Sequence, residues 1–269
     1  MRSILFYLPA IALLFASFIS CGQKEKPKSM EVTYLGNEGF LINTGKTKIL
    51  IDGLFRSKYY VSPPDSVLNK MMGSGLPFDS IEFMFVTHPH HDHFSDSLTC
   101  AFLQAHPETR FISSTETCDS MKHKTEKIQK QMTCIEPDTD RINYLSYGVT
   151  KITSLWLKHT GNQPVVNLAY IVQADGFTFC HVGDALLLMN EETLDKVPWD
   201  SLKIDVLFLT YFDKESPSLR YIKEKIKPKH IVLMHATKDN MQTAREIALE
   251  YFDNALVLEK PMNTVVLTK

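Results

Sequence analysis

Residues 87–93 read THPHHDH, a heptapeptide that holds four of the ten histidines of the chain. Imidazole suits zinc and similar borderline metals, and carboxylate adds a hard oxygen ligand. Alternate residues of a loop point to the same side, so His91 falls outside the alternation and is the least suitable ligand. Two pairs then face one ion each, namely His88 with His90, and Asp92 with His93. A cluster of this density predicts a metal site rather than a solvated polar loop.

One loop cannot complete two coordination spheres, so other parts of the chain must supply further ligands. Three residues share the position directly after a predicted strand: His159, Asp184 and His235. Each of them alone is well explained as an ordinary hydrogen-bonded residue. Together with the loop they make five histidines and two aspartates. That count matches two ions with three private ligands each and one bridging carboxylate.

Short apolar runs must position these ligands. Three runs within residues 32–52 form a meander, and residues 81–86 (IEFMFV) predict a buried strand that leads into the histidine loop. The remaining expected elements are strands at 110–113, 151–158, 169–174, 177–182, 204–210 and 231–234, and helices at 95–105, 216–226 and 241–251. The early meander and the later alternation of strands with helices predict an α/β fold of two mixed sheets with outer helices.

The amino-terminal end has the composition of an export signal. A basic Met1-Arg2 start precedes a nearly unbroken apolar run over residues 4–19, shorter than the roughly 20 residues that span a bilayer. Ser20-Cys21-Gly22 follows and resembles a bacterial lipobox, which implies cleavage before Cys21 and lipidation of its thiol. An uncleaved anchor and a plain signal peptide are the alternatives. The expected organisation is a signal peptide at 1–20, a lipidated tether at 21–30 and one domain at 31–269.

The overall composition is that of a globular protein, with 44% hydrophobic and 22% charged residues and a net charge of −2. It excludes a disordered or coiled-coil chain. It also lacks the basic excess that non-specific nucleic-acid binding needs, so we expect no nucleic-acid partner. Disulfides are possible in an exported protein, but the sequence leaves open the oligomeric state and the pairing of Cys100, Cys118, Cys134 and Cys180.

Taken in order, the motifs resemble those of the metallo-β-lactamase-fold hydrolase superfamily. THPHHDH is similar to its T-H-x-H-x-D-H signature, HVGDA and LMHAT match its later ligand motifs, and YLGNEGFLINTGKTKILID looks like its first strands. The resemblance implies a four-layer αββα sandwich. It also implies a first ion bound by His88, His90 and His159, a second bound by Asp92, His93 and His235, Asp184 as the bridge, and Asp52 holding the ligand loop through hydrogen bonds.

Details of these motifs narrow the resemblance to one branch. His90 stands where the flavodiiron oxidoreductases have a glutamate, and a bridging Asp184 differs from the pattern of true β-lactamases. The chain is most similar to the ascorbate-phosphate lactonases and N-acylphosphatidylethanolamine phospholipases D. Their opening often reads G-H-A/S, whereas this chain has Gly36-Asn37-Glu38, a departure that concerns the substrate. The tRNA-processing nucleases share the metal motif, but export and a mildly acidic chain argue against that role.

The resemblance implies a hydrolase that binds two divalent ions, zinc by preference and manganese or iron as alternatives. A hydroxide that bridges the ions would attack an ester, lactone or phosphodiester of a small or lipid-like substrate. Asp92 would orient that hydroxide as the catalytic residue. His181 and Tyr211 are candidates for the leaving-group acid, although a structural role explains each of them better.

Two other functions stay open. One is a non-catalytic metal-binding protein of the envelope that retains the fold, and the other is a mononuclear iron oxygenase of the same fold. The lipobox predicts a lipid-anchored protein of the bacterial cell envelope. Gly22 is not the aspartate that resembles an inner-membrane retention signal, so the outer membrane is favoured over the inner one.

Overall fold

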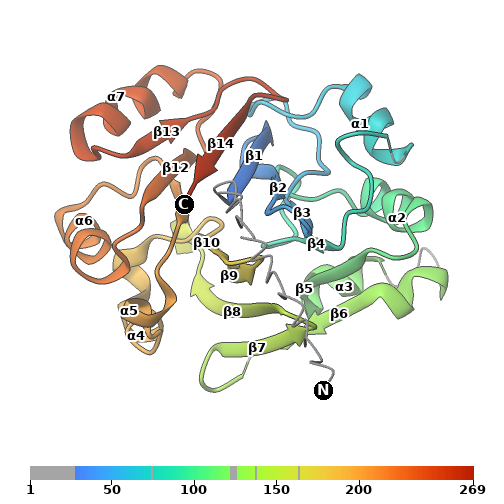
Figure 1. The fold of residues 1–269 in the computed structure, drawn as a ribbon, viewed down its shortest axis with the longest axis horizontal. Coiled ribbons are helices and arrows are strands. Elements are labelled where there is room, and N and C mark those ends of the chain that lie inside the picture. Colours follow the sequence, from blue (N-terminus) through green and yellow to red (C-terminus); the bar gives the residue numbers. More distant parts are fainter. Residues whose placement is uncertain (1–27, 74, 122–125, 137, 163) are drawn as a thin grey trace, which may run out of the picture.

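The computed structural model describes residues 28–73, 75–121, 126–136, 138–162 and 164–269. Two seven-stranded mixed sheets pack face to face, and helices cover the outer face of each (Figure 1). The predicted four-layer αββα sandwich of the α/β class is therefore confirmed. The predicted signal peptide at 1–20 and the Cys21 lipidation site lie outside the described residues.

The first sheet is built from the amino-terminal half of the chain and one strand from the carboxyl end. Its strands, in spatial order, are β14 (Thr264–Thr268), β1 (Ser29–Gly36), β2 (Gly39–Asn43), β3 (Lys48–Ile51), β4 (Phe83–Phe85), β5 (Arg110–Ser114) and β6 (Met132–Ile135). From β3 to β6 the strands run parallel, and from β14 to β3 they run antiparallel.

The second sheet mirrors this plan. Its strands, in spatial order, are β13 (Ala255–Val257), β12 (His230–Met234), β11 (Val206–Thr210), β10 (Phe177–His181), β9 (Val166–Ala174), β8 (Thr150–Lys158) and β7 (Ile142–Tyr147). Strands β10 to β13 are parallel, whereas β7 to β10 form an antiparallel meander. In both sheets the parallel half places consecutive strand ends, and the loops that follow them, at one edge.

Helices close the two outer layers. Three lie beside the first sheet: α1 (Asp65–Met72), α2 (Asp96–Ala105) and α3 (Thr115–Met121). The second sheet is covered by α4 (Glu191–Leu194), α5 (Trp199–Leu202), α6 (Ser216–Tyr221) and α7 (Met241–Tyr251), and a π-helical segment, Ile222–Ile226, prolongs α6. None of the helices in the described part of the chain has both the length and the apolar character that crossing a bilayer requires.

Alternation along the strands divides the apolar residues between two cores. In β2, Phe40 and Ile42 point into the layer between the sheets, and Leu41 points to the helices outside. In β4, Phe83 and Phe85 face the central core and Met84 the outer one. Both faces of these strands are buried, which explains why they read as continuous apolar runs rather than as alternating ones.

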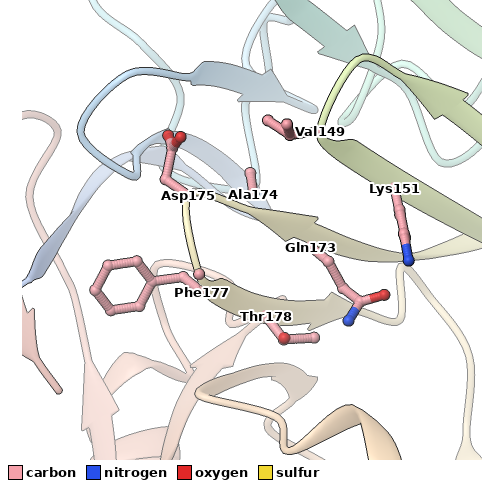
Figure 2. Close-up of a pocket in the computed structure, with 8 residues that line it drawn as sticks. Val149, Lys151, Gln173, Ala174, Asp175, Phe177 and Thr178 are labelled. Atoms are coloured by element: carbon pink, nitrogen blue, oxygen red, sulfur yellow. The ribbon is translucent and has the colours of Figure 1, made fainter.

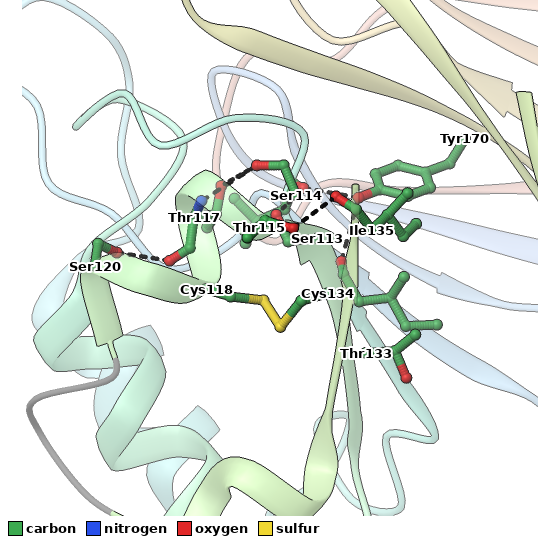
Figure 3. The surroundings of a disulfide bond; sticks show 12 residues. Ser113, Ser114, Thr115, Thr117, Cys118, Ser120, Thr133, Cys134, Ile135 and Tyr170 are labelled. Atoms are coloured by element: carbon green, nitrogen blue, oxygen red, sulfur yellow. Dashed lines mark hydrogen bonds between the residues drawn. A yellow bond between two sulfur atoms is a disulfide. The ribbon is translucent and has the colours of Figure 1, made fainter. Parts of the chain in front are cut away.

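A disulfide joins Cys118 of α3 to Cys134 of β6, sixteen residues apart (Figure 3). The bond fixes a short helix to the edge strand of the first sheet. It settles one pair that the sequence leaves open. Cys100 and Cys180 are both buried.

A pocket of about 270 Å³ lies at the turn between β9 and β10 and does not belong to the metal-ligating loops (Figure 2). Its carboxylate, Asp175, accepts hydrogen bonds from the Thr44 hydroxyl at 2.8 Å and from the Lys46 and Thr47 amides at 3.0 and 2.9 Å. This carboxylate therefore ties the second sheet to the β2–β3 turn of the first sheet. The turn is at the end of β10 opposite to His181, so the pocket is remote from the predicted site.

Candidate metal centre

The histidine loop follows β4 and is held in place by Asp52. The two oxygens of this carboxylate accept hydrogen bonds from the Thr87 amide at 2.8 Å and the Thr87 hydroxyl at 2.6 Å. The same carboxylate lies 3.0 Å from Nδ1 of His93 and accepts its hydrogen. The hydrogen bonds that the sequence assigns to Asp52 are therefore present, and they fix both ends of the ligand loop.

Four predicted ligands come together in a first group: His88, His90, His159 and Asp184. The His88 Nε2 atom lies 3.0 Å from Nδ1 of His90 and 3.3 Å from Nε2 of His159. The nearest carboxylate is that of Asp184, whose Oδ2 is 3.1 Å from His159 Nε2 and 3.8 Å from His88 Nε2. Three imidazoles from two loops thus converge on one carboxylate oxygen.

Neighbouring groups decide which ring nitrogens face inward. His159 Nδ1 lies 2.5 Å from the Thr160 carbonyl oxygen, which can only accept, so Nδ1 carries the proton. His88 Nδ1 lies 3.1 Å from the Thr87 hydroxyl, which already donates to Asp52 and so accepts from His88. Both Nε2 lone pairs then face each other, an arrangement that a shared cation stabilises.

A second group contains Glu38, His93, Asp184 and His235. Oδ1 of Asp184 lies 2.9 Å from Nδ1 of His235 and 3.3 Å from Nε2 of His93. Oε1 of Glu38 lies 3.3 Å from Nδ1 of His235. Asp184 therefore presents one oxygen to each group, which is the position that the resemblance assigns to a bridging ligand.

Local backbone geometry positions the two ligands that follow β10 and β12. Gly183 has a φ of +58°, and a Cβ there would lie 2.3 Å from Oδ1 of Asn167, so only glycine fits. That same Oδ1 accepts the Asp184 amide hydrogen at 3.0 Å. His235 itself has a φ of 64°, a left-handed conformation that is uncommon for a histidine and concentrates at functional sites.

Asp92 lies beside the second group rather than within it. Its Oδ2 is 3.6 Å from Nε2 of His93 and 3.4 Å from the side-chain amide of Asn37. His91 is exposed, as the alternation predicts, and lines a pocket of about 610 Å³ on the outer side of the loop.

The buried atoms of the second group fit a metal ion. Oε1 and Oε2 of Glu38, Oδ1 of Asp184 and Nδ1 of His235 are all inaccessible to solvent, and none of them has a hydrogen-bond partner among the described residues. Buried polar atoms are normally paired, because leaving one unpaired costs about 1–3 kcal/mol. Atoms that lie this close without hydrogen-bonding geometry are directed at a common centre, as the ligands of a cation are.

In the second group, burial and the neighbouring charges shift the pKa values of the histidines in opposite directions. Burial lowers the pKa of His93, but the Asp184 charge and the hydrogen bonds to Asp184 and Asp52 outweigh it and hold that pKa well above the ordinary value. For His235 too, burial lowers the pKa, but the Asp184 charge outweighs it, and the net effect raises the pKa to about 10. For His88, burial dominates and holds the pKa well below the ordinary value. An ion bound at the second group would therefore have to displace protons, whereas an ion bound by His88 would not.

Two residues of the site were not predicted from the sequence. Glu38 is fully buried, and burial raises the pKa of its carboxyl group to about 8, with the nearby Asp184 charge adding to the effect. Tyr60 places its hydroxyl 3.1 Å from Nε2 of His235 and stacks obliquely on that ring. The acidic side chain inside the otherwise apolar LGNEGFLI hairpin is the signal that could have identified Glu38, whereas Tyr60 lies in an irregular segment without one.

The two candidates for the leaving-group acid have structural contacts. His181 is fully buried, donates from Nε2 to the Glu38 carbonyl at 3.0 Å and accepts the Gly183 amide hydrogen at Nδ1. Burial lowers its pKa to about 4. The Tyr211 hydroxyl accepts from the Asn240 side chain at 3.0 Å. Both residues support the backbone or side chains around the site.

Comparison with known proteins shows which family the chain belongs to. The model of the beta-lactamase superfamily domain matches residues 31–235, well over half of the chain. A UPF0173 metal-dependent hydrolase of Pyrococcus furiosus is 26% identical over 219 residues, which cover 77% of this chain and 84% of that protein.

Two solved structures share the fold. The metallo-beta-lactamase fold protein YhfI from Bacillus subtilis superposes with a TM-score of 0.59 at 18% identity, covering 89% of this chain and 99% of its own. CmlA, a diiron beta-hydroxylase from Streptomyces venezuelae, superposes with a TM-score of 0.58 at 12% identity, covering 91% of this chain and 55% of its own. At these identities the likeness concerns the fold alone.

Proposed function

Because the chain belongs to the beta-lactamase superfamily, we propose that it is a dinuclear metal-dependent hydrolase that cleaves an ester, lactone or phosphodiester bond. One observation carries the proposal: Asp184 directs its two oxygens at two separate groups of ligands. The first group contains three imidazoles, of which His90 is partly exposed, and the second group contains two. A protein that had lost catalysis and kept only the fold would be expected to lose ligands from one of the two groups.

The residues of each half have defined tasks. His88, His90 and His159 would hold the first ion, His93 and His235 would hold the second, and Asp184 would be shared. Divalent ions at such a centre would lower the pKa of bound water and offset the negative charge that develops on the attacked group. Asp92 lies next to His93, where its carboxylate would orient the attacking water. Asp52 keeps His93 in the tautomer that presents Nε2 to the centre.

The substrate is proposed to be a small organic molecule or a lipid-like one, as in the lactonase and phospholipase branch. The resemblance to that branch supports this choice. A pocket of about 610 Å³ lies on the outer side of the ligand loop, with Phe94 and Leu98 as an apolar wall and Arg56, His91 and Asp96 as polar groups. None of its lining residues is a candidate metal ligand, so this pocket does not define where the substrate meets the centre.

We also propose that the protein is lipid-anchored in the cell envelope through Cys21, with the outer membrane favoured. The disulfide between Cys118 and Cys134 supports an oxidising compartment. Cys21→Ser should abolish labelling by a fatty-acid probe and release the protein from the membrane fraction. Unchanged labelling in this variant would refute the anchor without affecting the proposed chemistry.

The proposed reaction is tested by metal analysis together with a substrate panel. The domain from residue 28 onward, loaded with zinc or with manganese, is assayed on chromogenic phosphodiesters, lactones, thioesters and β-lactams. We expect about two ions per chain and turnover of one ester, lactone or phosphodiester class. Asp184→Ala should lose ions from both halves, whereas Asp205→Asn, which changes a buried carboxylate at the opposite end of β11, should keep them.

Two results would favour the other functions. Two bound ions with no turnover on any member of the panel would support a non-catalytic metal-binding protein. One iron per chain, with oxygen consumption in place of hydrolysis, would support an iron oxygenase. CmlA, which shares the fold, is a diiron beta-hydroxylase, so two irons per chain with oxygen consumption would likewise support an oxidative function.

A further inference from the structure

Glu38 is brought into the metal centre by a tight turn. Strand β1 ends at Gly36 and β2 begins at Gly39, so Asn37 and Glu38 form a two-residue connection, with Asn37 at a φ of 42°. A Cβ on Gly36 would lie 2.5 Å from the Val61 carbonyl oxygen, and a Cβ on Gly39 would lie 2.6 Å from that of Asp52. The turn is therefore fixed by close backbone contact on both sides.

Hydrogen bonds to the second sheet and to the histidine loop also hold this turn. His181 of β10 donates from Nε2 to the Glu38 carbonyl at 3.0 Å. The Asn37 side chain donates to the carbonyl of Asp92 in the histidine loop at 3.2 Å. The Glu38 side chain is completely buried. With its backbone fixed on both sides, the carboxylate has little freedom to move away from the histidines that it faces.

None of the described residues gives this carboxylate a hydrogen bond. Oε1 of Glu38 lies 3.3 Å from Nδ1 of His235, and Oδ1 of Asp184 lies 2.9 Å from the same nitrogen. Oε2 lies 3.7 Å from Nδ1 of His93, whose hydrogen goes to Asp52. Two buried carboxylates and two imidazoles that face one another in this way form a set of ligands that a divalent cation would complete.

We propose that Glu38 is an additional ligand of the second ion and makes that half of the centre the harder, more oxygen-rich of the two, a set that accepts manganese or ferrous iron as well as zinc. The proposal rests on the dinuclear centre of the proposed function. The first half offers three imidazoles and one carboxylate oxygen, which is a zinc-like set. The second half offers two imidazoles with the carboxylates of Glu38 and Asp184, and Asp92 stands beside them. Oxygen-rich sets suit harder ions such as manganese.

The test loads the metal-free protein with one equivalent of zinc and then with an excess of manganese. After removal of free metal, elemental analysis gives the bound ions per chain, and the manganese electron paramagnetic resonance signal reports the second half directly. We expect close to one zinc and one manganese in the unaltered chain. Glu38→Gln preserves shape but removes the charge, so it should weaken manganese binding at least tenfold and leave the zinc in the first half. Glu38→Ala should weaken manganese binding at least as strongly.

A stability measurement separates ligation from a structural role. Because none of the described residues hydrogen-bonds the Glu38 carboxylate, Glu38→Gln should not lower the melting temperature of the metal-free protein and should reduce the rise that manganese gives. A lower melting temperature in the metal-free variant would mean that Glu38 is a structural partner of His235 and would overturn the proposal. Asp205→Asn is the control for changing a buried carboxylate elsewhere.

Other outcomes separate the role of Glu38 from the proposed dinuclear hydrolase. Manganese affinity unchanged in both Glu38 variants, with two ions still bound, would overturn the role of Glu38 and leave the dinuclear hydrolase intact. Fewer than two ions in the unaltered chain under every loading condition would overturn both.

Discussion

Asp52 binds Thr87 twice, accepting hydrogen bonds from its amide and from its hydroxyl, one residue before the first histidine of the ligand loop. Asp52 follows β3 with a φ of 44°, and Thr87 follows β4, so the contact links two neighbouring parallel strands at the point where both end. The third hydrogen bond, from His93, brings the far end of the loop to the same carboxylate.

The first prediction concerns this support. Asp52→Ala should lower the affinity for the bound ions about 10- to 100-fold, because the ligands remain but their orientation is lost. The affinity is measured by competition with a chelator of known strength. Asp52→Asn keeps an acceptor for Thr87 and should show a smaller loss. Equal affinity in Asp52→Ala and the unaltered chain would contradict the supporting role.

The second prediction separates the two faces of the histidine loop. Asp92→Asn should reduce turnover at least about a hundredfold, because it removes a charge aimed at the reacting centre while keeping the side-chain shape. His91→Ala should keep both ions and most of kcat, because His91 is exposed on the outer side of the loop. A change in KM is the effect expected of a residue that lines the neighbouring pocket.

Turnover of both variants is measured with a melting curve for each. If His91→Ala were inactive while Asp92→Asn kept its ions and its activity, the assignment of the two faces would be reversed.

The third prediction uses pH and a carboxylate far from the metal centre. Burial alone would raise the pKa of Asp175, but the hydrogen bonds from Thr44, Lys46 and Thr47 outweigh it and lower that pKa. A lowered folded-state pKa stabilises the fold above the ordinary carboxyl range, and this contribution is lost as the pH falls through the folded-state value. Asp175→Asn should therefore cost about 1–2 kcal/mol of unfolding free energy at pH 7, with the difference shrinking toward pH 2.

Urea unfolding at several pH values checks this sign. Asp253→Asn, at an exposed position after α7, is the matched control and should change stability little at any pH. A difference for Asp175→Asn that grows toward acid would contradict the argument.

The fourth prediction concerns the disulfide. The Cys118–Cys134 bond closes a loop of sixteen residues, which by chain entropy stabilises the fold by about 3 kcal/mol. A reducing agent should therefore lower the melting temperature of the unaltered chain. The double variant Cys118→Ala with Cys134→Ala should start at the lower value and be insensitive to the reducing agent. Sensitivity in the double variant would place the effect elsewhere.

Much of the fold follows from the apolar runs, but the sheet edges do not. The expected strands at 81–86 and 204–210 correspond to β4 and β11, which are buried on both faces. Edge strands such as β7 and β14 were not predicted, because alternate positions are exposed and β14 pairs with β1 from the far end of the chain. Local periodicity carries no information about a partner more than 200 residues away.

The candidate site likewise contains residues that the sequence predicts and one, Glu38, that it does not. The predicted ligands are identified by a dense motif and by their position after strands, and the structure brings His88, His90, His159 and Asp184 together. Glu38 was noted only as a departure from a familiar opening. A side chain at a hairpin turn is normally exposed, and only the packing of the second sheet against this turn buries it.

Strand β1 runs from Ser29 to the Gly36 turn, a span of about 25 Å at the usual rise per residue. Ser29, the first residue of β1, and the metal centre therefore lie at opposite ends of the sandwich. A protein fixed to a bilayer by its amino-terminal side would hold the metal centre toward the surrounding aqueous space, with the body of the domain in between. Under that orientation a lipid-like substrate would reach the centre through solution, or after the predicted tether at 21–30 lets the domain turn toward the bilayer.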